Sequence, residues 1–459
     1  MTTAEIVSQK HENLGLFFEG HTTLPYSFRV QQLKLLRAAI KKHEAALLDA
    51  FYTDLHKSKF EAYGTEIGIV LEEISDHLKE LKKWMSPQKV SDNLLNFKSS
   101  NAIIAEPYGR ILIITPWNYP FQLLFAPLIG AISAGNTVAL KSSPYTPHVS
   151  EVMRQIISET FAEDYIAYFE GNRDMNEALL QQKWDLIFFT GSPELGKVVM
   201  QHAAVHLTPV ILELGGKSPT IVCKDADIRL AARRIAWGKF LNAGQTCLAP
   251  DYLLIHKSVK AAFLQYFTEA VKKFYGNDAQ LSPDYGRIVN TQTVDKLVAL
   301  MENAEVYCGG KSDREDRYIE PTVLLLPNAD HAVMSVEIFG PILPVLEFDA
   351  LEEAIRFVRA RPKPLALYLF SSNSETCERF MSHTSSGAMC INEVIMHISN
   401  SKLPFGGVGE SGMGSYHGKF SFEAFSHLKP VLDKSTLLDV PVRYPPYEGK
   451  MLIAKGLLH

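Results

Sequence analysis

The chain has 459 residues, which at about 100–200 residues per domain predicts two or three domains. It is 46% hydrophobic and 21% charged, so it can bury sizeable cores, which excludes a disordered chain. Its 46 Lys and Arg residues nearly balance 51 Asp and Glu residues, and a formal net charge of -5 gives no electrostatic signature of nucleic-acid binding.

No segment predicts secretion or a membrane crossing. Charges precede any apolar run at the N-terminus, unlike in a signal peptide. The most apolar segment, residues 122–134, contains a Pro and is shorter than the roughly 20 residues that a bilayer crossing needs. Five Cys residues, none in a C-x-x-C pair, are typical of a reducing compartment. We therefore expect a cytoplasmic protein with neither a membrane nor a nucleic-acid partner.

The first half of the chain predicts helices, then alternating strands and helices. Residues 5–83 are helical in pattern, and residues 91–107 are polar and extended. From Arg110 the run RILIITP predicts a buried strand that ends at a Pro. The elements expected after it are a helix at 121–134, a strand at 137–141, a helix at 148–163, the strand AYFEG, a short helix and a strand at 185–189.

A second alternating region begins at residue 209 with the strand VILEL, and no internal repeat is present. Strands that alternate with helices at this spacing predict right-handed crossovers and a parallel sheet. We therefore expect an α/β fold of two Rossmann-like open parallel-sheet domains with a small extra element. The elements expected here are a helix at 228–240, a strand at 252–256, a helix from 259, and strands at 305–308, 322–325, 342–348 and 366–371.

Several common catalytic motifs are incomplete. GGKS at 215–218 lacks the first Gly of a phosphate-binding loop, and His11-Glu12 lacks the second His of a zinc protease. Position 413 is Met where a serine-hydrolase elbow starting at Gly409 needs Gly, and no Cys/His group has zinc spacing. These failures disfavour metal and serine hydrolases, and we expect no metal site.

The strand at 185–189 leads into Thr190-Gly191-Ser192 and then into a helix that contains Gly196. A strand, a glycine turn and a helix N-terminus together form an anion site, because free N–H groups point out of the first helical turn. The spacing is Gly-x4-Gly and departs from the dinucleotide fingerprint. An ordinary turn explains this spacing equally well.

Two residues are candidates for the chemistry. Cys247 has Gly and small polar neighbours in AGQTCLA, although an isolated Cys is more often buried filler than a nucleophile. Glu213 ends the apolar strand VILEL. It is either a carboxylate satisfied by turn N–H groups or, in a partly dry site, a general base with a raised pKa.

Seven motifs in one order resemble the aldehyde dehydrogenase superfamily over nearly the whole chain. Three phrases, GQTCLAPDY, GSYHGKFSFEAFSH and RYPPYEGKM, resemble its short-tailed class 3 branch. The seven motifs are TPWNYP, GNTVALK, FTGSPELGK, LELGGKSP, NAGQTCLAPDY, EIFGP and LPFGGVGESGMGSYHGK.

The resemblance implies a catalytic set of Cys247, Glu213 and Asn118. Cys247 would add to the aldehyde carbonyl, and the Asn118 amide with the Cys247 N–H would hold the oxyanion. Hydride would then leave for the nicotinamide, and Glu213 would activate water to hydrolyse the thioester. A carboxylate at this position favours hydrolysis over transfer to coenzyme A.

The resemblance also implies a cofactor site. Lys141 would bond the adenosine ribose, and Glu337 with Phe339 would position the nicotinamide ribose. Many NAD-preferring relatives have a Glu three residues after the Lys, where this chain has Pro144. A Pro neither grips the 2′-hydroxyl nor repels a 2′-phosphate, so we expect NAD or NADP. The turn under the cofactor would comprise Gly191, Ser192 and Gly196.

An aromatic and aliphatic channel is implied for the substrate, which fits medium-chain or aromatic aldehydes. Ordinary helix packing is the alternative for Trp237. The positions that match the channel are Tyr119, Trp237, Ile395, Ile398 and Phe405.

The family fold implies a division of the chain and a homodimer. Residues 1–83 with 110–212 would bind the cofactor, and 213–402 would form the catalytic domain. Residues 84–109 with 403–459 would form a bridging element. Two other classes stay open, a cofactor-independent thiol esterase and a catalytically silent binding protein.

Overall fold

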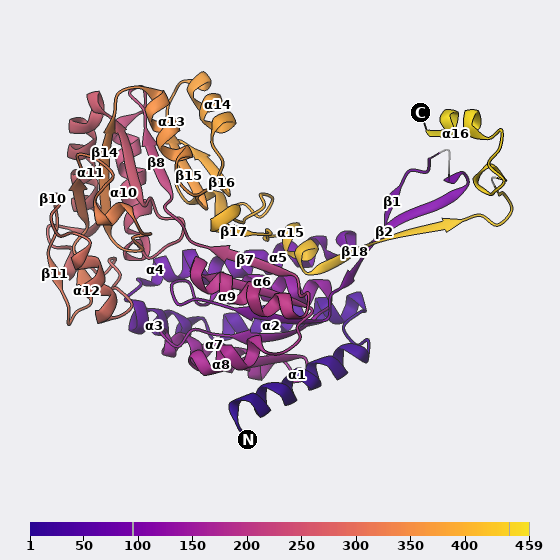
Figure 1. Ribbon diagram of the computed structural model, residues 1–459. Helices are drawn as coiled ribbons and strands as arrows, with labels where there is room; N and C mark the ends of the chain where they lie inside the picture. The colour runs from indigo at the N-terminus through magenta and orange to yellow at the C-terminus, as the bar shows by residue number, and fades with distance from the viewer. Residues whose placement is uncertain (94–95, 440, 459) are drawn as a thin grey trace.

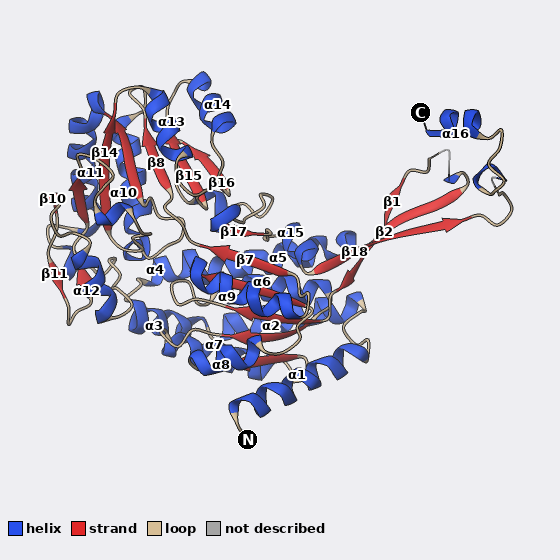
Figure 2. Ribbon diagram, viewed as in Figure 1, coloured by secondary structure: helices blue, strands red, loops and turns tan. Residues whose placement is uncertain are grey.

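The computed structural model describes residues 1–93, 96–439 and 441–458, and Figure 1 shows two lobes and a projecting arm. One lobe is built on a six-stranded sheet of order β17-β7-β6-β3-β4-β5, the other on a seven-stranded sheet of order β10-β13-β14-β9-β8-β15-β16. Helices flank both sheets (Figure 2). Most neighbouring strands are parallel, which confirms the predicted α/β class.

The first lobe has helices on both faces of its sheet. α6 (Gln122–Ala134), the most apolar segment, is buried at every residue. Burial inside the protein therefore explains why this helix is apolar on all of its faces. It packs against β3 (Arg110–Ile114) and β4 (Thr137–Lys141). The other elements are α1 (Thr3–Glu19), α2 (Tyr26–Lys42), α3 (Glu44–Leu55), α4 (Lys59–Ala62), a π-helical turn (Tyr63–Ile67), α5 (Gly68–Trp84), α7 (Pro147–Thr160), β5 (Ile166–Phe169), α8 (Arg173–Leu180), β6 (Leu186–Gly191), α9 (Pro193–Val205), β7 (Val210–Leu214), β17 (Gly412–Met413) and α15 (Lys419–Ala424).

In the second lobe five elements have the predicted bounds: the helix at 228–240 and the strands at 252–256, 305–308, 322–325 and 342–348. α10 (Ile228–Phe240) begins after Asp227, whose side chain accepts from the N–H of Leu230, and β9 is Tyr252–His256. β10 (Glu305–Cys308) runs antiparallel to its neighbour, so this sheet is not parallel throughout. The other elements are β8 (Pro219–Val222), α11 (Lys260–Tyr275), α12 (Thr291–Ala299), β11 (Ser312–Asp313), β12 (Tyr318–Ile319), β13 (Thr322–Leu325), β14 (Ile342–Phe348), α13 (Leu351–Arg359), β15 (Ala366–Phe370), α14 (Ser374–His383) and β16 (Ala388–Ile391).

The arm consists of β1 (Gln88–Val90), β2 (Ser99–Pro107) and β18 (Ser426–Lys434), paired antiparallel, followed by α16 (Met451–Leu458). It projects away from both lobes (Figure 1). The predicted limit between residues 212 and 213 falls inside β7, and β17 pairs with β7, so the lobes do not follow the predicted limits residue by residue. None of the described helices is both long and apolar enough to cross a membrane.

The strand order of the first sheet defines where a ligand would lie. β4 and β5 follow β3 on one side, whereas β6 and β7 lie on its other side. In open α/β sheets, ligands bind beyond the carboxyl ends of the strands where the order reverses. That point lies between the ends of β3 and β6, next to Gly191 at the end of β6 and to the segment after β3 that carries Asn118.

Candidate active site

A cavity of about 290 Å³ lies at the carboxyl ends of β3, β6 and β7. The first lobe supplies residues at or after the ends of these strands, and the second lobe contributes Cys247 and Glu337. Phe405 comes from the segment between the last strand of the second sheet and β17. The cavity therefore brings together residues that are up to about 290 positions apart in the sequence. The predicted residues among its lining are Asn118, Gly191, Ser192, Glu213, Cys247, Glu337, Phe339 and Phe405.

Cys247 follows a turn of unusual backbone conformation. Asn242 and Ala243 both have φ of 52°, and Gly244 has φ of 76°. Left-handed backbone at non-Gly residues costs roughly 1–3 kcal/mol each and persists only where the surroundings impose it. The Gln245 side chain does so here: its amide donates to the carbonyls of Asn242 at 3.0 Å and Arg287 at 2.9 Å.

The Asn118 amide lies against this turn. Its Nδ2 donates to the Gln245 carbonyl at 3.1 Å, and an amide nitrogen carries a second N–H that can serve an oxyanion. The Cys247 thiol is free of any disulfide. Burial, together with the nearby carboxyls of Glu337 and Glu213, raises the pKa of Cys247 to about 12. A thiolate therefore needs a cation or a base in the cavity.

Glu213 is a buried carboxyl group without a partner. Among the described residues, no donor lies within hydrogen-bonding distance of Oε1 or Oε2. The alternative of a strand-end carboxylate satisfied by turn N–H groups is therefore not what the structure has. Desolvation raises the pKa of Glu213 well above its usual value. Once ionised, such a carboxylate is a stronger base than an exposed one.

Glu337 lies beside a glycine that leaves it room. A Cβ at Gly215 would overlap the Glu337 carboxylate, so only Gly permits this approach. Burial raises the pKa of Glu337 to about 8. Lys217 donates to two carbonyls of the 333–336 loop and pairs with Asp251, which fixes the loop that precedes Glu337. The incomplete phosphate-loop motif GGKS therefore has a structural task in this protein.

Phe339 and the turn residues border the same cavity. The Phe339 ring meets Trp117 edge to face, with centroids 5.5 Å apart. Ser192 precedes α9, and its hydroxyl accepts from the N–H of Leu195 at 3.4 Å. Gly196 lies within α9, where a Cβ would meet the Leu214 side chain at 2.8 Å. Gly196 thus allows close packing of helix on strand and does not itself line the cavity.

Lys141 lies at the end of β4, away from this cavity. Its Nζ donates to the carbonyls of Ser142 and Gly171, both at 2.7 Å. Burial lowers the pKa of Lys141 to about 8. Lys141 is therefore a buried ammonium held by carbonyl groups, not a solvated strand end.

The structure brings only part of the predicted channel together. Phe405 lines the cavity, and Tyr119 lies behind it with its hydroxyl 2.6 Å from the Thr246 hydroxyl. Trp237 lines a separate surface hollow with Arg233 and Arg234. The predicted channel residues that do not line the central cavity are Tyr119, Trp237, Ile395 and Ile398.

Several residues of the site were not predicted from the sequence. Trp117, which adjoins Asn118 in the motif TPWNYP, lines the cavity together with Leu123 and Leu365. Apolar spacing alone cannot distinguish such residues from core. In the described part of the chain, no group of three or more His, Cys, Asp or Glu residues is arranged to hold a metal ion.

Comparison with known proteins gives a consistent family. The sequence model of the aldehyde dehydrogenase family matches residues 8–431. The 4,4'-diaponeurosporen-aldehyde dehydrogenase of Staphylococcus aureus is 50% identical, covering 98% of this chain and 99% of its own. A dimeric, NADP-preferring aldehyde dehydrogenase of Canis lupus familiaris is 45% identical, covering 97% and 99%. Further relatives are named as members of aldehyde dehydrogenase family 3.

A solved structure shares the fold throughout. The substrate-bound state of Staphylococcus aureus AldH superposes with a TM-score of 0.97 at 49% sequence identity. The match covers 99% of both chains.

Proposed function

Since the chain belongs to the aldehyde dehydrogenase family, in its class 3-like branch, we propose that Cys247, Glu213 and Asn118 oxidise aldehydes to carboxylic acids with NAD or NADP. One observation carries the assignment of residues: a free thiol and an unpartnered buried carboxyl group share one cavity. A structural role would not leave both Glu213 oxygens without a donor.

Each residue has a defined part in the reaction. The Cys247 thiolate adds to the carbonyl carbon, and the Asn118 amide donates to the resulting oxyanion. The C–H bond then breaks with its electron pair leaving as hydride, and the oxyanion collapses to a thioester on Cys247. Glu213 takes a proton from water, whose oxygen attacks the thioester and releases the carboxylic acid and the Cys247 thiolate.

The residues present fit a nicotinamide cofactor. A second hollow of about 540 Å³ shares Ser192, Gly215 and Glu337 with the central cavity, so the two together offer room for a ligand longer than an aldehyde. Glu337 would hold the nicotinamide ribose, and Lys141 the adenosine ribose. When bound, the cofactor supplies the hydride acceptor and a cationic ring, which opposes the raised pKa of Cys247.

We expect purified protein to reduce NAD or NADP when hexanal or benzaldehyde is added. The cavity is lined by apolar side chains, among them Trp117, Leu123 and Phe405, which favours aliphatic or aromatic aldehydes over charged ones. Formation of NAD(P)H, followed by its absorbance, measures the reaction. Hydrolysis of p-nitrophenyl acetate without any NAD(P)H formation would instead favour the thiol esterase. The absence of both activities would favour a catalytically silent binding protein.

We also expect both cofactors to be used, because Pro144 is exposed in the turn between β4 and α7 and bears no carboxylate. The ratio of the kcat/KM values for NAD and NADP should be modest and correspond to at most about 1–2 kcal/mol of differential binding. Pro144→Glu should shift the preference toward NAD by gripping the 2′-hydroxyl and repelling a 2′-phosphate. If the unmodified protein rejects NADP by several orders of magnitude, another residue discriminates.

The proposal includes a cytoplasmic homodimer. The arm exposes apolar side chains of β1 and β18, including Val90, Leu428 and Leu432, on a small sheet that projects from the lobes. A second copy would cover this surface, as the name of the dimeric canine relative also supports. All five cysteines are free, which favours the reducing cytoplasm.

A further inference from the structure

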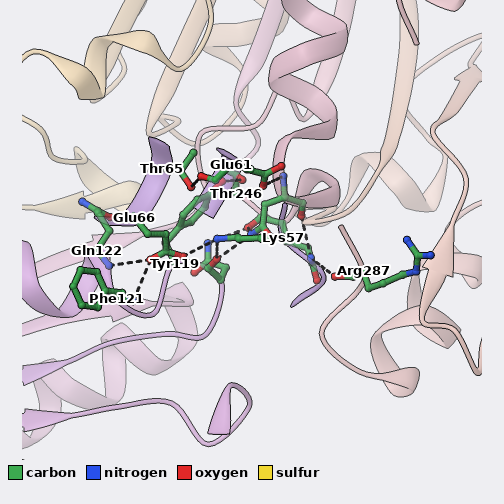
Figure 3. A network of polar contacts seen from close by, with 12 residues as sticks. Lys57, Glu61, Thr65, Glu66, Tyr119, Phe121, Gln122, Thr246 and Arg287 are labelled. Carbon is green, nitrogen blue, oxygen red and sulfur yellow. Dashed lines mark hydrogen bonds and ion pairs between the residues drawn. The ribbon is translucent and has the colours of Figure 1, made fainter. Parts of the chain in front are cut away.

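Three charged side chains from one short segment lie against the candidate active site. Lys57 and Glu66 are fully buried, and Glu61 is partly buried between them in sequence. They belong to the loop before α4, to α4 itself and to the π-helical turn that follows it. Figure 3 shows them in one network of polar contacts together with Tyr119 and Thr246. We call Lys57, Glu61 and Glu66 the 57–66 clamp.

Lys57 holds the backbone of the oxyanion donor. Its Nζ donates to Glu66 Oε1 at 2.7 Å and to the carbonyl oxygen of Asn118 at 3.0 Å. The same ammonium lies 3.9 Å from the centroid of the Tyr119 ring. Asn118 and its neighbour are thus fixed by a buried cation, whereas the side-chain amide of Asn118 stays turned to the cavity.

Glu66 holds the other end of the same stretch. Its Oε2 accepts from the backbone N–H groups of Phe121 at 3.1 Å and Gln122 at 2.9 Å (Figure 3). These groups belong to the start of α6, where helix N–H groups have no partner within the helix. The Lys57–Glu66 pair therefore holds residues 118–122 at both ends, through the Asn118 carbonyl and through the N–H groups that follow Pro120.

Glu61 connects this stretch to the nucleophile turn. Its Oε1 accepts from the backbone N–H of Asn242 at 2.9 Å. The Asn242 side chain in turn donates to the Asn118 carbonyl, also at 2.9 Å. Asn242 is the first residue with left-handed backbone before Cys247. The clamp therefore holds both the oxyanion donor and the turn that presents the thiol.

Such a clamp is a costly way to obtain stability. Burying two charges removes their hydration, and an apolar pair of similar volume is often equally stable or more so. Desolvation raises the pKa of Glu61 to about 7 and raises that of Glu66, and the charge of Lys57 opposes both shifts. What the ionic contacts provide and apolar packing cannot is a fixed direction for the groups they bind.

We propose that Lys57, Glu61 and Glu66 are positioning residues that hold the Asn118 amide and the Cys247 turn in the geometry of acylation. The inference rests on the proposed function, because it assigns these residues a part in the chemistry of Cys247. Small displacements of reacting groups cost up to about 10²-fold in rate, so the effect is measurable.

A double-mutant cycle tests the proposal. Lys57→Met should slow the acylation burst about 10–100-fold when Asn118 is present, and less than about threefold in an Asn118→Ala background. Two readouts are followed: the NAD(P)H burst with hexanal, and the nitrophenolate burst with p-nitrophenyl acetate, which acylates Cys247 without cofactor. Lys59→Met is the matched control, because Lys59 belongs to the same segment but is exposed. It should leave both bursts unchanged.

Two further variants separate positioning from folding. Lys57→Met/Glu66→Met removes both charges and should recover the thermal stability lost in Lys57→Met while both bursts stay slow. Glu61→Leu should slow acylation about tenfold, whereas Glu61→Gln keeps an acceptor for Asn242 and should retain most of the rate.

Three outcomes would overturn the clamp: equal losses in both Asn118 backgrounds, recovery of the burst in the double Met variant, or a normal burst in Glu61→Leu. Failure of the proposed function is a different result. If the proposed function fails, the unmodified protein gives no NAD(P)H burst, but the nitrophenolate burst can still be used to compare the clamp variants.

Discussion

Cys247→Ala is expected to abolish both NAD(P)H formation and ester hydrolysis, by at least about four orders of magnitude, while cofactor binding persists. The thiol is the sole cysteine among the described residues that line the central cavity, which it shares with the unpartnered carboxyl group of Glu213. Steady-state absorbance and a fluorescence titration with NADPH measure the two properties separately.

Cys223→Ala is the matched control for this substitution. Cys223 is also a buried free thiol, and burial raises its pKa to about 12 as well, but it follows β8 in the core of the second lobe. We expect it to keep most of the activity, since Cys223 does not line the cavity. Substantial turnover by Cys247→Ala, beyond trace contamination, would place the nucleophile elsewhere.

The elements that were predicted well are those whose ends are marked by residues within or next to the element. α10 and β9 were predicted to the residue because a capping Asp and a short apolar run define their ends. β18 was not predicted. Its sequence SHLKPVLDK is exposed and contains a Pro, and its pairing with β2 joins segments more than 300 residues apart. No local pattern encodes such a contact.

The site likewise contains residues that sequence motifs predict and residues whose role depends on long-range packing. The motifs predicted Cys247, Glu213 and Asn118, and the structure places all three around one cavity. The 57–66 clamp was not predicted, because Lys and Glu residues in a helical, polar segment are usually solvated. Their burial follows from packing between the lobes. Trp237 and Ile398 do not line the central cavity, so their place in a substrate channel stays a prediction from the resemblance.

Glu213→Gln is expected to separate the first turnover from those that follow. The substitution removes the proton acceptor but preserves size, and acylation with hydride transfer uses the Cys247 thiolate and the Asn118 amide without a general base. General-base assistance contributes about 10²–10⁴-fold, so hydrolysis of the thioester should slow by that order. Stopped-flow absorbance should show a burst of NAD(P)H close to the enzyme concentration, followed by a slow steady state.

The pH dependence supplies an independent check, because the base acts only when ionised. With its pKa raised by burial, Glu213 loses its role at a higher pH than an exposed carboxylate does, so steady-state turnover should fall as the pH drops toward that raised pKa. In Glu213→Gln, the rate of the slow hydrolysis step should no longer fall with decreasing pH in this way. Absence of both burst and turnover in a folded, cofactor-binding variant would instead assign Glu213 to thiol activation. Unchanged turnover would remove it from the chemistry, and the missing partners of its carboxyl group would then need another explanation.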